Sequence, residues 1–411
     1  MKTNRVEQHI IKKNNPQWKL IDELCFKSKN LYNYANYIIR QEFINNKKWI
    51  RYNELFQLCK ESEPYKEIGS NVGQQTLKLL DQNWRSFFAG IKEWNKNKDK
   101  FLGKPKLPNY KEKEGRYNLI IDNIKFSISD GYLRFSWSKL KPLNNKIRTN
   151  VNGKLMQVRF IPKSDTYIME IVYEIDVPEK ISYNNNIIGI DIGIDNLATV
   201  GNNIGLQSFI INGKPLKSIN QYYNKEKSKK QSDLKLKHDK NWSNKLQQLT
   251  NKRNNKITDY IHKTSKYIIN WCIENNIDTV VVGKNKDWKQ ESNMSRKVNQ
   301  NFVGIPHSLF IEKIKYKCEN VGINFIETEE SYTSGTSFLD GEIPCKENYN
   351  KSRRVARGLF QSNGGEFINA DLNGAYQIIK KVFPDAFAEG IEGVGLHPVR
   401  VNLTNQIGIF E

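Results

Sequence analysis

The stretch "NNNIIGIDIGIDNLATV", residues 184–200, carries a carboxylate inside the pattern of a buried strand. Ile187, Ile188 and Ile190 predict that strand, and residues 193–196 predict the turn that reverses the chain. Asp191 lies near the end of the strand, where an unpaired charged carboxylate costs several kcal/mol to desolvate. Another part of the chain must therefore compensate for this charge.

The composition indicates a partner of opposite charge. The 411 residues are 38% hydrophobic, which is enough for two or three domains with their own cores. Lys and Arg number 65 against 44 Asp and Glu, so the net charge is +21. An excess of basic residues along the whole chain favours binding of a polyanion, because phosphates that the protein neutralises release their counterions. A basic protein without such a partner is the alternative.

The cysteines indicate a reducing compartment. No C-x-x-C pair, secretory signal or apolar run of membrane-spanning length is present. We therefore expect a cytoplasmic protein with reduced thiols, no membrane partner and no zinc site. The five cysteines are far apart in the chain: Cys25, Cys59, Cys272, Cys318 and Cys345.

The first part of the chain predicts helices and a small barrel. Residues 16–99 show apolar residues at spacings of three and four, which core packing between helices explains. Residues 1–15 and 100–180 hold a strand-like start and the alternation of antiparallel strands, so we expect them to form a small β-barrel.

A loop after residue 100 interleaves basic and aromatic side chains. This pattern suits a nucleic-acid backbone, although a solvated loop would look the same. Its basic residues are Lys104, Lys106, Lys111, Lys113 and Arg116.

After Pro178 the pattern changes to alternating strands and helices, which predicts a mixed α/β layer. A hairpin-like stretch follows the strand at 187–192, and a lysine-rich helical insertion covers about 216–275. Then come a strand ending at Gly283, a helix at 307–320, the strand "INFIETEE" and a helix that starts at Asp371.

Three acidic positions are placed to converge in this layer. Asp191 ends one strand, one of the glutamates Glu327, Glu329 and Glu330 ends a later strand, and Asp371 opens a helix with one apolar face. Since the carboxyl ends of parallel strands share one edge, the three can meet there. Converging carboxylates need a cation, and oxygen ligands alone select Mg²⁺ or Mn²⁺. Two such ions would clamp a scissile phosphate. Taken singly, the three would be a turn cap, a helix N-cap and a surface glutamate.

The sequence resembles the TnpB-type nucleases of bacterial insertion sequences, relatives of the type V CRISPR effectors. The resemblance covers most of the chain and rests on five segments in order: "IIGIDIGIDNLATV", "GKNKDWKQ…NQNFVGIPHSLF", "ESYTSGTSFLD", "RRVARGLF" and "INADLNGAYQIIKK". It implies a multidomain α+β protein, in which a helical recognition domain and a wedge barrel precede a RuvC-like nuclease domain of the RNase H fold at 181–411.

The same resemblance implies the roles of particular residues. By this resemblance, Asp191 is the first RuvC carboxylate and Asp371 is the last. Asn373 would orient this centre without binding the metal itself. Three arginines of "SRRVARGLF" would contact phosphate, with a solvated loop as the alternative: Arg353, Arg354 and Arg357.

The third carboxylate departs from the family pattern. Most relatives carry a glutamate directly after the second core strand, where this chain has Gly283. One branch is thought to move it to the strand before "SYTS", so we expect Glu330 as the third ligand. Other candidates are Glu327, Glu329 and Asp287.

The loop before the last carboxylate is the second departure. The family places two C-x-x-C pairs between "YTS" and the last Asp. Here about 331–368 forms a zinc-ribbon-like remnant with Ser337, Asp340 and Cys345, and no zinc is expected.

The resemblance, together with the three acidic positions, implies an RNA-guided DNA endonuclease that cuts double-stranded DNA beside a short motif with two Mg²⁺ ions. The guide RNA would come from a transposon end or a CRISPR array, and the chain length fits a monomer. One alternative is a cleavage-deficient, RNA-guided DNA-binding protein with a repressor-like role. The other is a resolvase-like enzyme that acts on DNA junctions as a dimer.

Overall fold

The computed structural model describes residues 2–164, 166–284, 304–388 and 395–403. The chain is a mixed α/β protein that divides into two compact units, Met1–Asp176 and Val177–Glu411. Among the helices described, none combines the length and the apolar composition needed to cross a bilayer.

Four helices form the first part of unit 1, where the sequence predicts a helical domain. Trp84 is fully buried, and Phe43, Phe88 and Trp49 pack around it or each other with ring centroids 4.7–6.0 Å apart. Aromatic packing therefore holds α1, α4 and the segment between α1 and α2 together. The helices are α1 (Trp18–Asn46), α2 (Tyr52–Cys59), α3 (Glu63–Ile68) and α4 (Ser70–Lys96).

The strands of unit 1 form an open sheet and a separate hairpin. The antiparallel sheet has the order β1-β6-β5-β2, and β3 pairs with β4. The predicted small barrel is thus not closed by strand pairing within the described residues, because β1 and β2 remain sheet edges. The strands are β1 (Lys2–Lys12), β2 (Leu119–Asp122), β3 (Phe126–Ser129), β4 (Tyr132–Phe135), β5 (Lys154–Lys163) and β6 (Thr166–Asp176).

A six-stranded mixed sheet is the centre of unit 2. Its order is β11-β10-β7-β8-β9-β14. Strands β7, β8 and β9 are antiparallel neighbours, whereas β10 and β11 run parallel to β7. The strands are β7 (Ile187–Ile192), β8 (Asn196–Asn202), β9 (Phe209–Asn212), β10 (Thr279–Gly283), β11 (Asn324–Thr328) and β14 (Val399–Val401), with a small hairpin of β12 (Leu359–Gln361) and β13 (Phe367–Asn369) outside the sheet.

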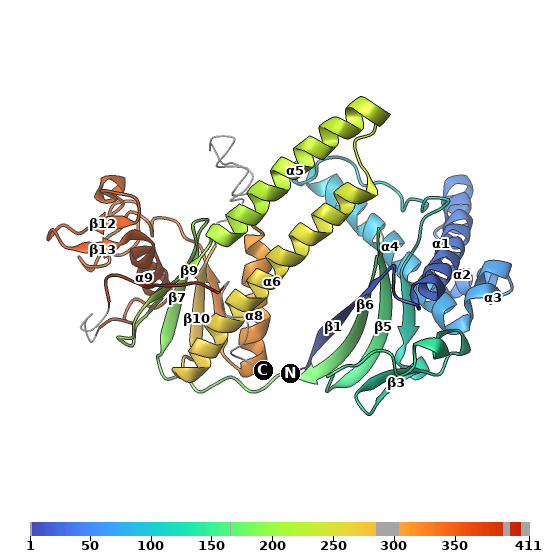
Figure 1. The fold of residues 1–411 in the computed structure, drawn as a ribbon, viewed down its shortest axis with the longest axis horizontal. Coiled ribbons are helices and arrows are strands. Elements are labelled where there is room, and N and C mark those ends of the chain that lie inside the picture. The colour runs from blue at the N-terminus through green and yellow to red at the C-terminus, as the bar shows by residue number, and fades with distance from the viewer. Residues whose placement is uncertain (1, 165, 285–303, 389–394, 404–411) are drawn as a thin grey trace. The chain divides into compact units, whose positions relative to one another are not determined.

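Helices cover both faces of this sheet (Figure 1). Ile188 and Ile190 of β7 pack toward α6 and α8, whereas Ile187 packs against α9. Because successive strand residues point to opposite faces, Asp191 lies on the α9 side. The helices are α5 (Lys214–His238), α6 (Asn244–Glu274), α8 (His307–Val321) and α9 (Ala370–Val382).

Two glycines allow α9 to approach the sheet closely. Gly189 of β7 and Gly201 of β8 are cross-strand partners. A Cβ at Gly189 would lie 2.2 Å from the carbonyl oxygen of Ala375, and one at Gly201 would lie 2.7 Å from the ring of Tyr376. Only glycine fits at these two positions, so the close packing of α9 on the sheet depends on them.

Gly189→Ala is expected to destabilise unit 2 by about 2–3 kcal/mol, because the new methyl group meets backbone rather than a side chain that can move. Thermal unfolding followed by circular dichroism should show the melting temperature falling by about 5–10 °C. The matched control is Gly364→Ala, whose Cβ would come no nearer than 3.7 Å to Ser362 and should change little. Equal melting temperatures for both variants would contradict this account of the packing.

Candidate functional site

A pocket of about 260 Å³ opens at the edge of the sheet where β7, β10 and β11 end. Asp191, Glu330 and Asp371 all line it. Asp191 stands opposite Thr199 of β8 in the strand register, and Thr199 lines the pocket as well. The remaining lining residues are Ile192, Gly193, Asn196, Thr333, Ser334 and Arg354.

Asp371 is the second residue of α9, but it does not cap the helix. The cap is Asn369, whose side-chain oxygen accepts the backbone N–H groups of Asp371 and Leu372 at 3.1 Å. The Asp371 carboxylate is therefore not needed as a helix cap and lines the pocket instead. It accepts hydrogen bonds from Asn196 Nδ2 at 2.7 Å and from Arg354 Nη2 at 3.1 Å.

Glu330 reaches the pocket by lying across Gly283. A Cβ on Gly283 would stand 2.4 Å from both Cγ and Oε1 of Glu330. The glycine at the end of β10 therefore provides the space that the glutamate from the β11 side occupies. The two other glutamates are placed differently: Glu327 is paired with Lys284 at 2.7 Å, and Glu329 is exposed. Asp287 lies outside the described residues.

The carboxyl groups influence one another strongly. Burial raises the pKa of Asp191 well above its usual value, and the nearby Glu330 and Asp371 raise it further, while Arg354 opposes them. Burial also raises the pKa of Glu330 to about 7, against the effect of Lys381. A raised pKa means that the charged form is disfavoured here unless a cation joins the group.

The donor set of the pocket suits a hard divalent cation. Besides the three carboxylates, Asn196 Oδ1 and Thr199 Oγ1 are buried oxygens that have no hydrogen-bond partner among the described residues. Oxygen donors alone are what Mg²⁺ and Mn²⁺ prefer. In the described part of the chain, however, no three Asp, Glu, His or Cys side chains stand as a ready-made metal site. The pocket thus offers suitable ligands rather than a formed coordination shell.

The three predicted arginines have three different partners. Arg354 pairs with Asp371 and lines the pocket. Arg357 pairs with Asp195, which also binds Lys217 at 2.5 Å. Arg353 instead makes a bidentate pair with Glu342 at 2.6 and 2.9 Å, and both side chains are about 15% exposed. Its guanidinium is thereby engaged within the protein, and the phosphate contact of Arg353 stays a prediction.

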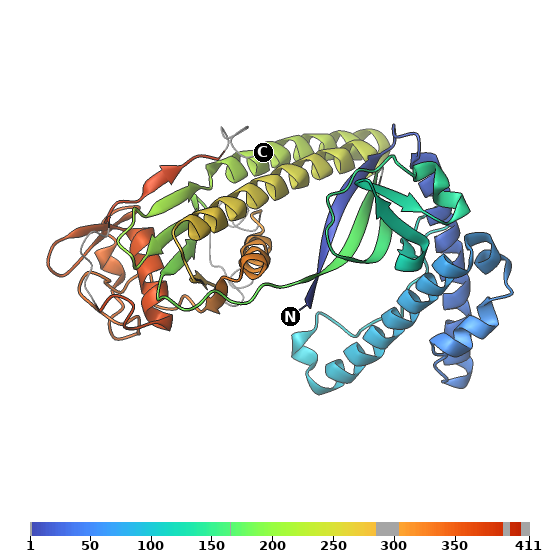
Figure 2. The same ribbon diagram turned by 90° about the horizontal axis from the view of Figure 1, so that it is seen from below.

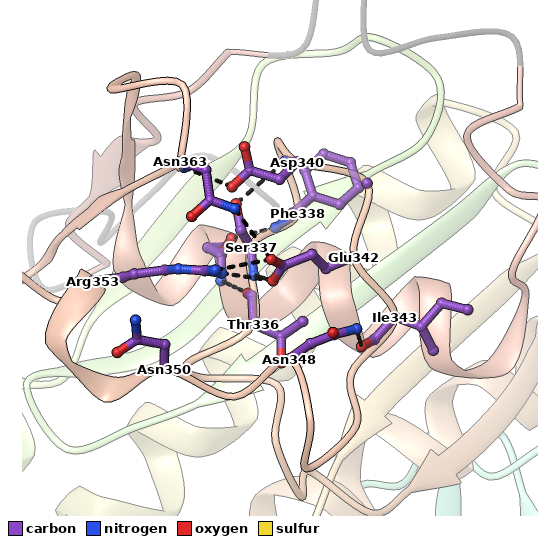
Figure 3. Close-up of polar contacts among 12 residues, drawn as sticks. Thr336, Ser337, Phe338, Asp340, Glu342, Ile343, Asn348, Asn350, Arg353 and Asn363 are labelled. Carbon is purple, nitrogen blue, oxygen red and sulfur yellow. Dashed lines mark hydrogen bonds and ion pairs between the residues drawn. The ribbon is translucent and has the colours of Figure 1, made fainter.

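Glu342 is the centre of a polar network that orders the loop before α9 (Figure 3). Besides Arg353, the backbone N–H of Ser337 donates to it at 2.8 Å. Asp340 accepts the backbone N–H of Asn363, also at 2.8 Å. In this loop, charged hydrogen bonds therefore connect residues that are 5 to 23 positions apart in the chain.

Asn373 attaches α9 to this same loop. Its fully buried side chain accepts from the N–H of Phe338 and donates to the carbonyl oxygen of Thr336, both at 2.9 Å. Both bonds go to loop backbone, so Asn373 acts on the position of the loop that borders the pocket.

The basic loop of unit 1 is largely tied to its own helices. Arg116 makes a bidentate pair with Asp22 at 2.7 and 3.0 Å. The Lys111 ammonium lies about 5 Å from the ring centres of Tyr32 and Tyr117, and that of Lys104 lies 5.6 Å from Trp94. Lys104, Lys106 and Lys113 are exposed to solvent, although Lys104 also lies over the Trp94 ring.

The polar pocket residues Asn196 and Thr199 are absent from the sequence prediction. One signal for Thr199 was present, because a tight hairpin after Asp191 places the residue eight positions later on the same face. Asn196 had no comparable signal, since its contact with Asp371 spans 175 positions.

Two segments of the chain match known families. Residues 170–289 match a family described as "Probable transposase" (OrfB_IS605), and residues 307–378 match one described as "Cas12f1-like, TNB domain". Asp191 lies in the first segment, and Glu330 and Asp371 lie in the second. The chain is a TnpB-like relative of the type V effectors. No curated protein matches it.

Several solved structures are distantly similar. One is the Cas12f1–sgRNA–target DNA complex, at 16% identity and a TM-score of 0.36, covering 91% of this chain and 98% of that one. A CRISPR-Cas12f ternary complex shows 14% identity and a TM-score of 0.37, covering 88% and 81%. A Cas12i–crRNA–dsDNA complex shows 11% and 0.35, covering 92% and 69%.

Proposed function

We propose that this protein is an RNA-guided DNA endonuclease with one RuvC-type hydrolytic site. The observation that carries the proposal is the convergence of Asp191, Glu330 and Asp371 on one pocket from three distant parts of the chain. The order of the sheet, three antiparallel strands followed by two parallel ones, supports an RNase H-like core. The match of both halves of the site to transposase and Cas12f1-like families supports a nuclease.

The three carboxylates would hold Mg²⁺, with Mn²⁺ as a substitute and two ions as the expected number. When bound, the cations would polarise a phosphodiester and supply hydroxide from water at neutral pH. The chain itself provides orientation: Asn196 fixes one oxygen of Asp371, and Asn369 satisfies the helix end. Arg354 places a positive charge at the pocket where the phosphate would enter.

The remaining parts of the proposal concern the partners. The net charge of +21 supports binding of nucleic acid, and the family supports guide RNA and target DNA. We infer that base pairing reads the target sequence, that the protein reads a short motif beside it, and that one monomer in the cytoplasm is sufficient.

Copurified RNA followed by cleavage tests this proposal. The full chain is expressed with its flanking transposon or repeat DNA, and its bound RNA is extracted and sequenced. The purified complex then receives Mg²⁺ and a plasmid library that carries the RNA-matched target beside randomised bases. We expect one discrete RNA and cutting only with matched target and Mg²⁺, with EDTA-treated complex as the control. A discrete RNA with target binding but no cutting would establish the repressor-like alternative instead. Cutting of branched junctions without RNA would establish the resolvase-like one.

A further inference from the structure

The helices α5 and α6 form a long basic hairpin in unit 2, lying side by side in both views (Figure 1 and Figure 2). Helix α5 carries eight lysines against two carboxylates, and Leu216 and Asn220 are its buried residues. A helix that is polar nearly all round buries no continuous apolar face against the rest of its domain. The hairpin therefore has a large charged surface that the packing of unit 2 does not use.

A second pocket, of about 330 Å³, lies between these two helices. Ile219 and Leu249 supply half-buried apolar surface, and Tyr222 adds an aromatic ring that is 64% exposed. None of the lining residues is acidic, which is unusual for a polar surface and favours an anionic ligand. The eight lining residues are Ser218, Ile219, Tyr222, Tyr223, Leu249, Lys252, Arg253 and Lys256.

One wall of the pocket is held rigidly. The Arg253 guanidinium donates to Asn220 Oδ1 at 2.6 and 2.8 Å and to the carbonyl oxygen of Gly304 at 2.6 Å. It also lies 5.7 Å from the ring centre of Tyr223, whose hydroxyl meets Thr250 Oγ1 at 3.0 Å. These contacts fix the wall in advance, so little conformational entropy is lost when a ligand enters.

Exposed cations also line the pocket. Lys252 and Lys256 stand four residues apart on α6, so their ammonium groups project from the same side of the helix. An open aromatic ring next to two such cations is the combination that binds single-stranded nucleic acid, since the ring stacks a base and the ammonium groups meet phosphates. A pocket near the lower end of the usual size range admits one nucleotide rather than a duplex.

We propose that this pocket captures one unpaired nucleotide of a single strand. Its base stacks on Tyr222, its phosphates contact Lys252 and Lys256, and the Ser218 hydroxyl lies within the same pocket to meet the sugar. The proposal deepens the proposed function, because it names a contact through which the hairpin holds nucleic acid. Both RNA and DNA provide this chemistry, and the experiment below separates them.

The test uses the full-length protein, freed of bound nucleic acid in high salt and assayed in EDTA so that no cleavage can occur. The probes are short oligo(rU) and oligo(dT) strands that each carry one fluorescent aminopurine. Stacking on Tyr222 should quench the probe, and Tyr222→Ala should abolish the quenching and weaken binding about tenfold. Tyr222→Phe, which keeps the ring, should behave as the unmodified protein. The strand that binds more tightly identifies RNA or DNA as the source.

Matched controls separate the pocket from general attraction to the hairpin. Tyr183→Ala removes another exposed tyrosine of unit 2 and should leave the quenching unchanged. Removing Lys252 and Lys256 together should weaken binding more than removing Lys229 and Lys237, two exposed lysines of α5 with the same total charge. Equal losses in the two double variants, or quenching that survives in Tyr222→Ala, would overturn the proposal. Because the assay needs no divalent ion, its failure is distinct from a failure of the proposed cleavage.

Discussion

Asp191→Asn is expected to abolish DNA cleavage and, without divalent cations, to raise the melting temperature of the protein. The carboxylate is the central ligand of the proposed site, and its loss removes several kcal/mol of transition-state stabilisation, or about a thousandfold in rate or more. The same charge is unfavourable for folding, because burial, Glu330 and Asp371 raise the pKa of Asp191.

The sign of the stability effect follows from linkage. An acid whose pKa is higher in the folded than in the unfolded state binds more protons when folded, so its contribution falls as the pH rises above the usual value of 3.8. At neutral pH the uncharged amide of the Asp191→Asn variant avoids the free-energy cost of a charged carboxylate at this buried position. We expect thermal unfolding in EDTA to show a gain of a few degrees, and titration with Mg²⁺ to stabilise the unmodified protein more than the variant.

The control for this prediction is Asp385→Asn, which neutralises an exposed carboxylate of the same unit. It should change neither cleavage nor melting temperature. Guide and target binding should persist in Asp191→Asn, so that a gel shift separates lost chemistry from lost binding. Cleavage at the unmodified rate by Asp191→Asn would remove this carboxylate from the proposed chemistry.

Moving the third carboxylate from residue 330 to residue 283 is expected to keep part of the activity. Glu330→Gln alone should lower cleavage about a hundredfold or more, since one ligand is lost. In the double variant with Gly283→Glu and Glu330→Gly, a glutamate at the end of β10 would point into the space that Glu330 now fills. Cleavage by the double variant should therefore exceed that of Glu330→Gln.

A second comparison tests whether cleavage depends on the space above Gly283 as well as on the charge of Glu330. Gly283→Ala should lower cleavage while the fold is retained, because the added methyl group meets the side chains of Glu330 and Ile378, which can shift, rather than backbone. The matched change Glu329→Gln affects an exposed glutamate and should have no effect. If Glu329→Gln and Glu330→Gln lowered cleavage equally, Glu330 would have no special role.

The elements that the sequence predicts best are those with strong local patterns. The strand around Asp191 and the helix after Asp371 appear where the apolar spacing predicts them, because each buries one regular face. Alternation along β7 then suffices to place Asp191 on the α9 side of the sheet. The mixed α/β class follows from such segments.

Features that depend on distant contacts could not be derived in this way. Nothing in the spacing distinguishes Arg353, held by Glu342, from Arg354, which lines the pocket. The sheet of unit 1 remains open at β1 and β2, although its strands alternate as those of a barrel would. Likewise Asn369, not Asp371, caps α9, and either residue type suits that position.

The glycine at the end of β10 also bears on how such sites change over generations. In the proposed site, a carboxylate on the neighbouring loop would do the work of one on the strand, because the glycine at the end of the strand leaves room for it. The segment that supplies a catalytic acid can therefore differ between related proteins, while the carboxyl group keeps the same position in the site. Proteins with such a displaced carboxylate would be missed by searches for a sequence motif, and superposition of their backbones would find them.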